Sequence, residues 1–368
     1  MALIKFNGIG IRSISVTVPK QVIKTVSCTD LFPKDQLLKF IETTGVEERR
    51  IADSTTCSSD LCFDAAQNLI NSNEIDPEDI DALIFISQTP DYKIPGSSLI
   101  LQNRLMLRKS TIAFDINLTC SGYIYGLYIA YSLLSNPALN NVLLLVGETL
   151  SKITSKSDKS TGLLLGDGGS ATLINKDQKY GDSFFSLNTD GAHFNSVIIP
   201  SGGTRNMSNN ESLKQKTYED GSIRSDEQLA MQGMDVFSFA VSEIPKDVKS
   251  LLGFAQVSVE SIDKVIFHQS NRYMMNVIAK KAKIDQSKML YSINKFGNTS
   301  GVSIPSAVAF EKDKIKDNDL VLLNAIGAGF SWGSAIITFK DINILKINEY
   351  ESLHQSNLIL PSNPNIDK

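Results

Sequence analysis

The sequence predicts a mixed α/β fold in which one αβ unit is used twice. Residues 75–88 and 257–270 resemble each other, because each runs from a turn through an acidic step into an apolar strand. Strands that are apolar along their whole length, separated by stretches of helical periodicity, are typical of mostly parallel sheets with helices on both faces. At 368 residues, 42% of them hydrophobic, the chain is long enough for two such halves facing each other.

The elements that follow in each copy also correspond. Each half is expected to contain a short strand leading into small residues, then a closing buried strand and a Gly-rich segment. The short strands are 113–116 in the first half and 290–293 in the second. The closing strands are 141–147 and 319–325, and the Gly-rich segments are 166–170 and 327–334. Pseudo-twofold symmetry between the halves would bring the equivalent segments that follow these strands to one crevice.

The polarity of the chain sets the predicted boundaries. The N-terminal half spans 1–177, the C-terminal half 178–340, and 341–368 is an appended tail whose Ser, Asn and Pro content predicts weak order. A polar excursion at 203–228 fits either a solvated surface loop or a lid over a site.

The charge balance excludes some partners. Lys and Arg number 36 against 40 Asp and Glu, and the net charge of −4 gives no reason to expect nucleic acid or an anionic membrane. No charged residue lies between Asp115 and Glu148, but polar residues shorten the apolar part to 118–134, which predicts a buried helix and no membrane span. The four cysteines form no C-x-x-C pair and no signal peptide precedes the fold, so we expect a cytoplasmic protein.

Cys120 is the first candidate for chemistry. It follows the strand 113–116 and opens the apolar helix, so its sulfur is expected at a helix N-terminus. The unpaired N–H groups and the dipole there favour the thiolate, which lowers the pKa of the thiol and makes it a nucleophile. A buried cysteine acting as a small hydrophobe is the alternative interpretation.

His268 and Asn298 are the other two candidates. His268 ends the second copy of the repeated strand, where a neutral imidazole can donate a hydrogen bond into a crevice, although a satisfied core histidine fits equally. Asn298, beside Gly297, is by itself typical of a turn residue. In the repeat, however, it lies in the segment of the second half that corresponds to the Cys120 segment of the first. A cysteine, a histidine and an asparagine at one crevice would form a reactive set.

Cofactor motifs are missing. The Gly-rich segments at 166–169 and 327–329 are not followed by Lys-Ser or Lys-Thr, and 8–13 lacks the third glycine of a dinucleotide-binding turn. No spacing of His and Cys suits zinc. The turn at 327–329 can instead expose backbone N–H groups to a developing oxyanion.

Four blocks of residues carry a family resemblance. They are 115–122 (DINLTCSG), 267–271 (FHQSN), 296–300 (FGNTS) and 327–335 (GAGFSWGSA). In order and spacing they resemble the signature blocks of 3-oxoacyl-(acyl carrier protein) synthase III. Further similarity at 44–52 and 166–171 extends the match from about residue 5 to residue 340.

The resemblance implies a thiolase-like five-layer αβαβα fold, a homodimer and a decarboxylative condensation that initiates fatty acid or related biosynthesis. Cys120 matches the nucleophile that takes an acyl group from coenzyme A, and His268 and Asn298 match the pair that promotes decarboxylation of malonyl-acyl carrier protein. The resulting carbanion attacks the acyl-Cys thioester and gives a 3-oxoacyl-acyl carrier protein. No metal or redox cofactor is implied.

The resemblance also assigns supporting residues. The backbone N–H groups of Cys120 and Ala328 would form the oxyanion hole, and Lys280 and Lys281 would dock the acidic carrier protein, although adjacent lysines are also common on a solvated helix face. Ile94 matches the position that reaches across the dimer to close the acyl pocket. The substrate-binding set is Ile94, Gly233, Phe237 and Asn271.

Three positions depart from the family pattern. Lys39 replaces an aromatic residue that stacks on the coenzyme A adenine, and Thr43 and Tyr273 replace two arginines. Loss of this platform and these phosphate partners makes a carrier-protein donor an alternative to coenzyme A.

Three functions therefore stay open on the sequence. The first is decarboxylative condensation, and the second is transfer of the acyl group from Cys120 to an oxygen or nitrogen nucleophile, with His268 as general base. The third is a non-catalytic subunit that shapes the pocket of a partner synthase. Retention of Cys120, His268 and Asn298 argues against the third.

Overall fold

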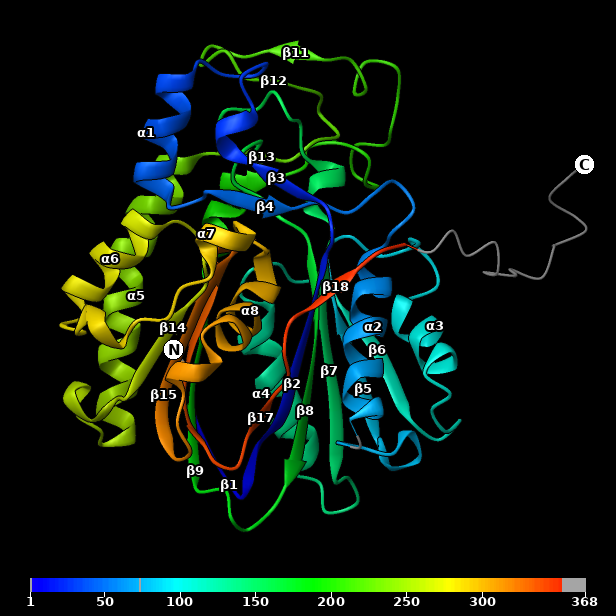
Figure 1. Ribbon diagram of the computed structural model, residues 1–368, viewed down its shortest axis with the longest axis vertical. Helices are drawn as coiled ribbons and strands as arrows, with labels where there is room; N and C mark the ends of the chain where they lie inside the picture. The colour runs from blue at the N-terminus through cyan, green and yellow to red at the C-terminus, as the bar shows by residue number, and fades with distance from the viewer. Residues whose placement is uncertain (1, 73, 353–368) are drawn as a thin grey trace, which may run out of the picture.

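The computed structural model describes residues 2–72 and 74–352, which form two sheets that face each other (Figure 1). The first sheet has the order β17-β2-β8-β7-β5-β6, with β18 also paired to β2, and the second has the order β1-β9-β16-β15-β14. The strands of the first are β17 (Asn343–Ile344), β2 (Ile9–Pro19), β8 (Gly168–Lys176), β7 (Asn141–Glu148), β5 (Ala82–Ile86), β6 (Ile112–Ile116) and β18 (Asn348–Tyr350). Those of the second are β1 (Ala2–Asn7), β9 (Asp182–Thr189), β16 (Ser331–Phe339), β15 (Asp319–Gly327) and β14 (Lys264–Phe267).

Three short strand pairs lie outside these sheets. They are β3 (Val22–Lys24) with β4 (Glu48–Arg50), β10 (Val197–Ile198) with β13 (Ala230–Met231), and β11 (Lys216–Thr217) with β12 (Ile223–Arg224). Figure 1 shows all three at the same end of the molecule, above the two sheets.

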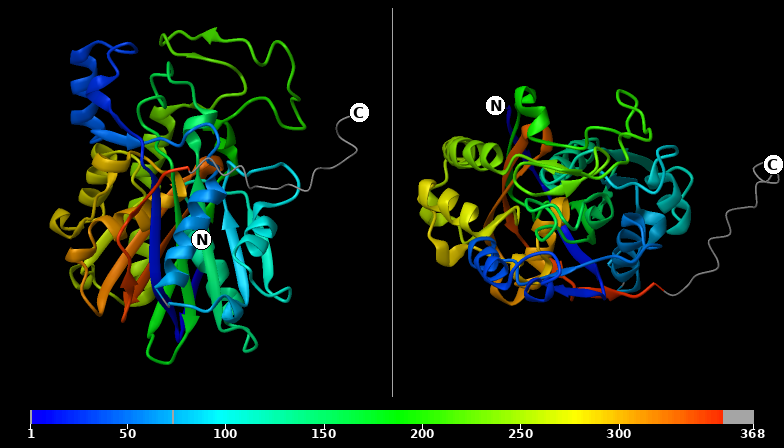
Figure 2. Two further views of the ribbon diagram at one scale, coloured as in Figure 1. Left: turned by 45° about the vertical axis from the view of Figure 1, so that its right-hand side comes forward. Right: turned by 90° about the horizontal axis from the view of Figure 1, so that it is seen from above.

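Helices make the remaining three layers. Helices α4 and α8 lie between the sheets, α2 and α3 cover the outer face of the first sheet, and α5 and α6 cover the second (Figures 1 and 2). This αβαβα arrangement of two similar halves confirms the predicted fold class. The helices are α1 (Lys34–Thr44), α2 (Ser58–Asn71), α3 (Ser97–Arg104), α4 (Gly122–Leu134), α5 (Gly233–Ala255), α6 (Arg272–Lys281), α7 (Ile293–Phe296) and α8 (Ser303–Phe310).

The apolar sequence runs account for the centre of the fold. Every residue of β5 is buried, and this strand pairs in parallel with β6 and β7. Helix α4 carries no charged residue and buries Tyr123, Leu127 and Tyr131 between the two sheets, because both of its sides meet apolar strands. The expectation of a buried helix at 118–134 is confirmed, and within residues 2–72 and 74–352 no helix is long and apolar enough to cross a bilayer.

The structure corrects three predictions, which concern a strand, the boundaries of the halves and the tail. Residues 290–293 do not form a strand, since only an isolated bridge joins Met289 to Val265. Strand β1 pairs with β9 in the second sheet, while β17 and β18 join the first, so the boundaries at 177 and 340 do not separate the sheets. The tail is ordered through 341–352 because it pairs with β2, and 353–368 lies outside the described residues.

The loop 203–228 fits the surface-loop interpretation better than the lid. It carries the hairpin β11–β12, and Arg224 forms an ion pair of 2.8 Å with the buried Asp158. None of its residues lines the cavity that contains Cys120.

Candidate active site

A cavity of about 570 Å³ lies between the two halves, at the ends of their parallel strands. Cys120 enters it from the segment between β6 and α4, His268 from the residue after β14, and Asn298 from the turn after α7. The fold therefore brings together the three residues singled out in the sequence. Two come from the second half and one from the first, as pseudo-twofold symmetry predicts.

The tautomer of His268 is set by a buried serine. His268 Nδ1 lies 2.7 Å from Ser303 Oγ, which also accepts the Gln269 N–H at 3.3 Å. Because Ser303 Oγ accepts from Gln269, we assign its own hydrogen to Nδ1, and this assignment places the ring proton of His268 on Nε2. Burial lowers the pKa of His268 to about 4, so the imidazole is neutral at pH 7 and can still donate from Nε2.

Asn298 is fixed by the first half of the molecule. Its backbone N–H donates to Leu164 O at 2.9 Å, and its backbone carbonyl accepts from Gly166 N at 3.0 Å. The carboxamide oxygen accepts from the Ser300 N–H at 2.9 Å, which leaves the amide NH₂ as a donor for the cavity. Gly166 is required here, because a Cβ at this position would collide with the carbonyl oxygen of Phe296.

The prediction that the helix N-terminus lowers the pKa of Cys120 is wrong. Helix α4 does begin at Gly122, directly after the Cys120–Ser121 step, but burial raises the pKa of the thiol to about 11. The hydroxyls of Ser300 and Thr119 favour the thiolate and offset part of this rise. Desolvation of the charged sulfur therefore outweighs the helix end, and the resting group is a thiol.

The predicted oxyanion donor is already engaged. The N–H of Ala328, in the turn η9 (Ala328–Phe330) between β15 and β16, donates to Thr119 Oγ1 at 3.0 Å. Thr119 Oγ1 therefore occupies the direction in which a developing oxyanion would approach. Rotation of the Thr119 side chain would release this N–H.

The predicted substrate residues divide into two groups. Gly233, Phe237 and Asn271 line the cavity together with Ala328. Ile94 does not, because its side chain is 89% exposed on the surface of the single chain.

The predicted docking lysines lie in the last turn of α6, and both are exposed. Lys281 Nζ donates to Val241 O at 3.1 Å, which ties it to α5. Lys280 makes no such contact within the described residues, so it is the freer of the two for a partner.

The three departures from the family pattern also have clear positions. Lys39 and Thr43 are exposed on α1 and do not line the cavity. Tyr273 stacks on Phe237 with ring centroids 5.8 Å apart and an interplanar angle of 14°. An aromatic surface is therefore present at the edge of the cavity, supplied by α5 and α6 in place of α1.

Sequence reasoning missed two buried groups at this site. Ser303 gave no signal, because only the fold brings its hydroxyl to His268. Glu148 ends the apolar strand β7, and burial raises the pKa of its carboxyl to about 8 while Thr89 Oγ1, Ser87 Oγ and the Gln88 N–H donate to it. A lone acid after an uninterrupted apolar run was a usable signal.

Metal ligands are not grouped at this site. Over the described ranges 2–72 and 74–352, no cluster of three His, Cys, Asp or Glu side chains could hold a metal ion.

Two facing αβ halves with Cys, His and Asn at their shared cavity define the class of thiolase-fold condensing enzymes. Family models agree: residues 114–191 match 3-oxoacyl-[acyl-carrier-protein (ACP)] synthase III, and 252–339 match its C-terminal part. A putative 3-oxoacyl-[acyl-carrier-protein] synthase 3 of Campylobacter jejuni is 36% identical over 349 residues, 92% of this chain and 96% of that protein. The chain belongs to the 3-oxoacyl-(acyl carrier protein) synthase III family.

Two further comparisons support this membership. A β-ketoacyl-[acyl-carrier-protein] synthase III of Fusobacterium nucleatum is 34% identical over 334 residues, 90% of this chain and 98% of that protein. The crystal structure of a 3-oxoacyl-(acyl-carrier protein) synthase from Burkholderia xenovorans superposes with a TM-score of 0.88 at 33% identity, over 95% of this chain and 99% of that one.

Proposed function

We propose that this protein is an acyltransferase that condenses an acyl thioester with malonyl-acyl carrier protein, losing carbon dioxide and giving a 3-oxoacyl-acyl carrier protein. The observation that carries the proposal is the convergence of Cys120, His268 and Asn298 on one cavity. Membership of the 3-oxoacyl-(acyl carrier protein) synthase III family supports the same chemistry.

The first half-reaction acylates Cys120. The sulfur bonds to the thioester carbonyl carbon, the bond from that carbon to the donor sulfur breaks, and the donor thiol leaves with the proton that Cys120 gives up. The N–H groups of Cys120 and Ala328 would hold the tetrahedral oxyanion once Thr119 releases Ala328. Because burial raises the pKa of Cys120, proton loss has to accompany substrate binding.

The second half-reaction uses the other half of the chain. His268 Nε2–H and the Asn298 NH₂ would both donate to the thioester oxygen of the malonyl group. As the bond to the carboxylate breaks, its electron pair forms an enolate that these two donors stabilise, and carbon dioxide leaves. The carbanion attacks the acyl carbon on Cys120, the bond from that carbon to the Cys120 sulfur breaks, and the departing thiolate takes up a proton from water. No electron is transferred to a cofactor, so two neutral donors suffice and no metal is needed.

We also propose a homodimer. Strand β6 lies at the edge of its sheet, and an edge strand presents unpaired N–H and C=O groups to a second strand. Large apolar side chains are exposed on β6 and on the segments next to it, where a second copy would cover them. They are Ile94, Leu99, Met106 and Ile112. A second copy paired along β6 would bring the partner's Ile94 toward this protomer.

Two features of α5 and α6 suit the two kinds of acyl donor. The aromatic pair of Phe237 and Tyr273 offers a stacking surface for coenzyme A, while the exposed Lys280 suits an acidic carrier protein.

The test is intact-protein mass spectrometry after mixing the protein with acyl-coenzyme A and acyl-carrier-protein thioesters, followed by malonyl-carrier protein. Cys120→Ser is the control, and Cys57→Ser is its match, because Cys57 is a free cysteine outside the cavity. We expect an adduct that depends on Cys120 and that malonyl-carrier protein discharges as a 3-oxoacyl product.

Two other results would decide against the proposal. An adduct that malonyl-carrier protein cannot discharge, but a hydroxyl or amine acceptor can, would indicate transfer to oxygen or nitrogen. No adduct from any donor would indicate a non-catalytic role.

A further inference from the structure

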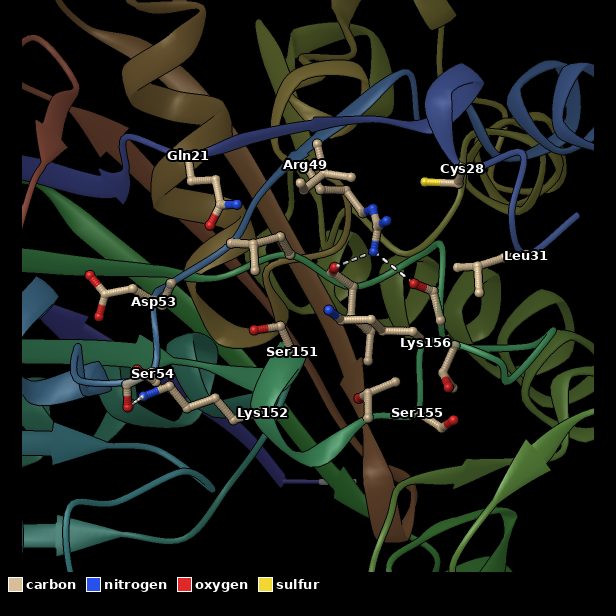
Figure 3. Close-up of a pocket in the computed structure, with 17 residues that line it drawn as sticks. Gln21, Cys28, Leu31, Arg49, Asp53, Ser54, Ser151, Lys152, Ser155 and Lys156 are labelled. Atoms are coloured by element: carbon tan, nitrogen blue, oxygen red, sulfur yellow. Dashed lines mark hydrogen bonds between the residues drawn. The ribbon is translucent and has the colours of Figure 1, made fainter. Parts of the chain in front are cut away.

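A second cavity, of about 520 Å³, lies beside the catalytic one (Figure 3). It is formed by β3, β4, the η3 turn (Leu150–Ile153) and the segment that follows this turn, and it shares Thr161 and Leu165 with the catalytic cavity. Its volume is in the range of small-molecule sites. None of Cys120, His268 and Asn298 lines it, so the proposed reaction gives it no role.

Arg49 supplies a buried cation to this cavity. The residue is 6% exposed, and Figure 3 shows its Nη1 donating to two carbonyl oxygens, those of Gly162 at 2.7 Å and Leu165 at 3.3 Å. Arg49 Nε is buried without a hydrogen-bond partner, and Nη2 makes no hydrogen bond in the described part of the chain.

Within the described residues this guanidinium forms no ion pair: burial lowers the pKa of Arg49, and the nearby Cys28 and the buried Asp167 offset only part of that effect. The neighbouring residue Arg50 pairs with Glu349 at 2.8 Å, but no ion pair within the described residues includes Arg49. The nearby Asp167 instead accepts from Ser151 and the Ala52 N–H, and Asp53 accepts from Thr55, Thr56 and Ser352. Buried charges are normally paired directly, and Asp167 acts on Arg49 without an ion pair, so a ligand anion could supply the direct partner.

The rest of the cavity is suited to hydrocarbon. Ile23, Leu31, Ile51 and Leu165 give it apolar walls, and the exposed Lys152 and Lys156 stand at its rim. A small hydrated anion would leave these walls unfilled, and an uncharged chain would leave Arg49 unpaired. A carboxylate with a hydrocarbon chain would pair with Arg49 and fill the space between the apolar walls.

We propose that this cavity is a second binding site, distinct from the catalytic one, for a medium-chain monocarboxylate whose carboxylate pairs with Arg49. The chain would lie against Ile23, Leu31 and Ile51. This proposal does not depend on the reaction assigned to Cys120.

Cys28 provides a reporter at the site. It lines the cavity, is half-buried, and points its sulfur toward the Arg49 guanidinium in Figure 3. The test measures, by peptide mass spectrometry, the rates at which N-ethylmaleimide alkylates Cys28, Cys57 and Cys120 with and without octanoate. Cys57 lies outside both cavities and serves as the internal reference.

At an octanoate concentration about ten times its Kd, alkylation of Cys28 should slow about tenfold, because only unoccupied sites react. Cys57 should not change. 1-Octanol, which lacks the anion, and inorganic phosphate, which lacks the chain, should protect Cys28 far less.

Two variants separate binding from folding. Arg49→Gln should lose the protection, although removal of a buried cation could also impair folding. Leu31→Trp fills the cavity from a partly exposed position, so it should lose the protection while its melting temperature and its Cys120 alkylation rate stay at wild-type values. Equal protection by octanol or by phosphate, protection at Cys120 alone, no protection at Cys28, or full protection in Leu31→Trp would overturn the proposal.

Discussion

Burial has opposite consequences for the titratable groups that the two halves supply to the cavity. In the first half it raises the pKa of the Cys120 thiol to about 11, which opposes formation of the nucleophile. In the second half it lowers the pKa of His268 to about 4, which keeps the imidazole neutral as a donor to an enolate. The same dry cavity therefore hinders a group that must become charged and helps one that must not. One topology, used twice, can therefore carry unlike chemistry, because each half presents different side chains to the cavity.

The largest expected effect is that of Asn298→Ala, which should separate the condensation step from the acylation step. Asn298→Ala removes one of two donors to the enolate, so condensation should fall by about 10²–10³-fold, as for loss of one oxyanion donor. Acylation of Cys120 should stay near the wild-type rate, because the proposed acylation step uses Cys120 and the N–H of Ala328 but not the Asn298 side chain. Single-turnover assays of acyl-enzyme formation and of carbon dioxide release measure the two steps.

Asn71→Ala, at the exposed end of α2, is the matched control. Normal carbon dioxide release by Asn298→Ala would contradict the role proposed for the second half.

The pH dependence of Cys120 tests the effect of burial on the first half. A thiol with a pKa of about 11 is mostly protonated at pH 7, so its alkylation rate by iodoacetamide should rise about tenfold per pH unit, or about 100-fold from pH 7 to pH 9. A short unstructured peptide with one cysteine, measured in parallel, should level off as pH passes about 8.5. A plateau for Cys120 below pH 8 would mean that the helix end dominates after all.

Ser303 tests how the second half holds its donor. Ser303→Ala removes the hydrogen bond to Nδ1 of the neutral ring, so decarboxylation should slow about tenfold through loss of one hydrogen bond of about 1 kcal/mol and of the fixed tautomer. That bond also favours the neutral form, so its loss should raise the pKa of His268 and move the acidic limb of the rate profile toward neutrality.

In the wild-type protein, His268 should leave decarboxylation flat between pH 6 and pH 8, because its pKa of about 4 lies below this window. Ser303→Thr should restore both the rate and the profile. A slower variant with an unchanged acidic limb would indicate that Ser303 only supports packing.

Lys280 gives the smallest effect and concerns binding alone. Lys280→Glu should raise KM for malonyl-carrier protein by up to about fivefold, since an exposed charge pair contributes about 1 kcal/mol or less. Both chemical steps should keep their rates. Lys281→Glu should act more weakly, because Lys281 already donates to Val241 O. Equal KM values at low and high salt would argue against this docking role.

The sequence allowed the repeat, the buried helix and the site to be predicted, because each rests on local pattern. Fully apolar strands such as β5 require cover on both faces, and equivalent positions in a repeat must meet when the halves face each other. The paired strands β1 and β17 escaped prediction for the opposite reason. Neither strand carries a signal that names its distant partner, and only the finished sheets present the edges on which they pair.

The sequence by itself was enough to single out Cys120, His268 and Asn298 as candidates, because each stands in a local motif that can be recognised without a structure. Only the tertiary structure decided their protonation states, because desolvation depends on everything packed around a group and not on its neighbours in the chain. The structure also brought Ser303 to His268, and it placed Asp167 near Arg49 without an ion pair between them in the part of the chain that it describes. Such pairings form between residues far apart in sequence, so they exist only once the chain has folded.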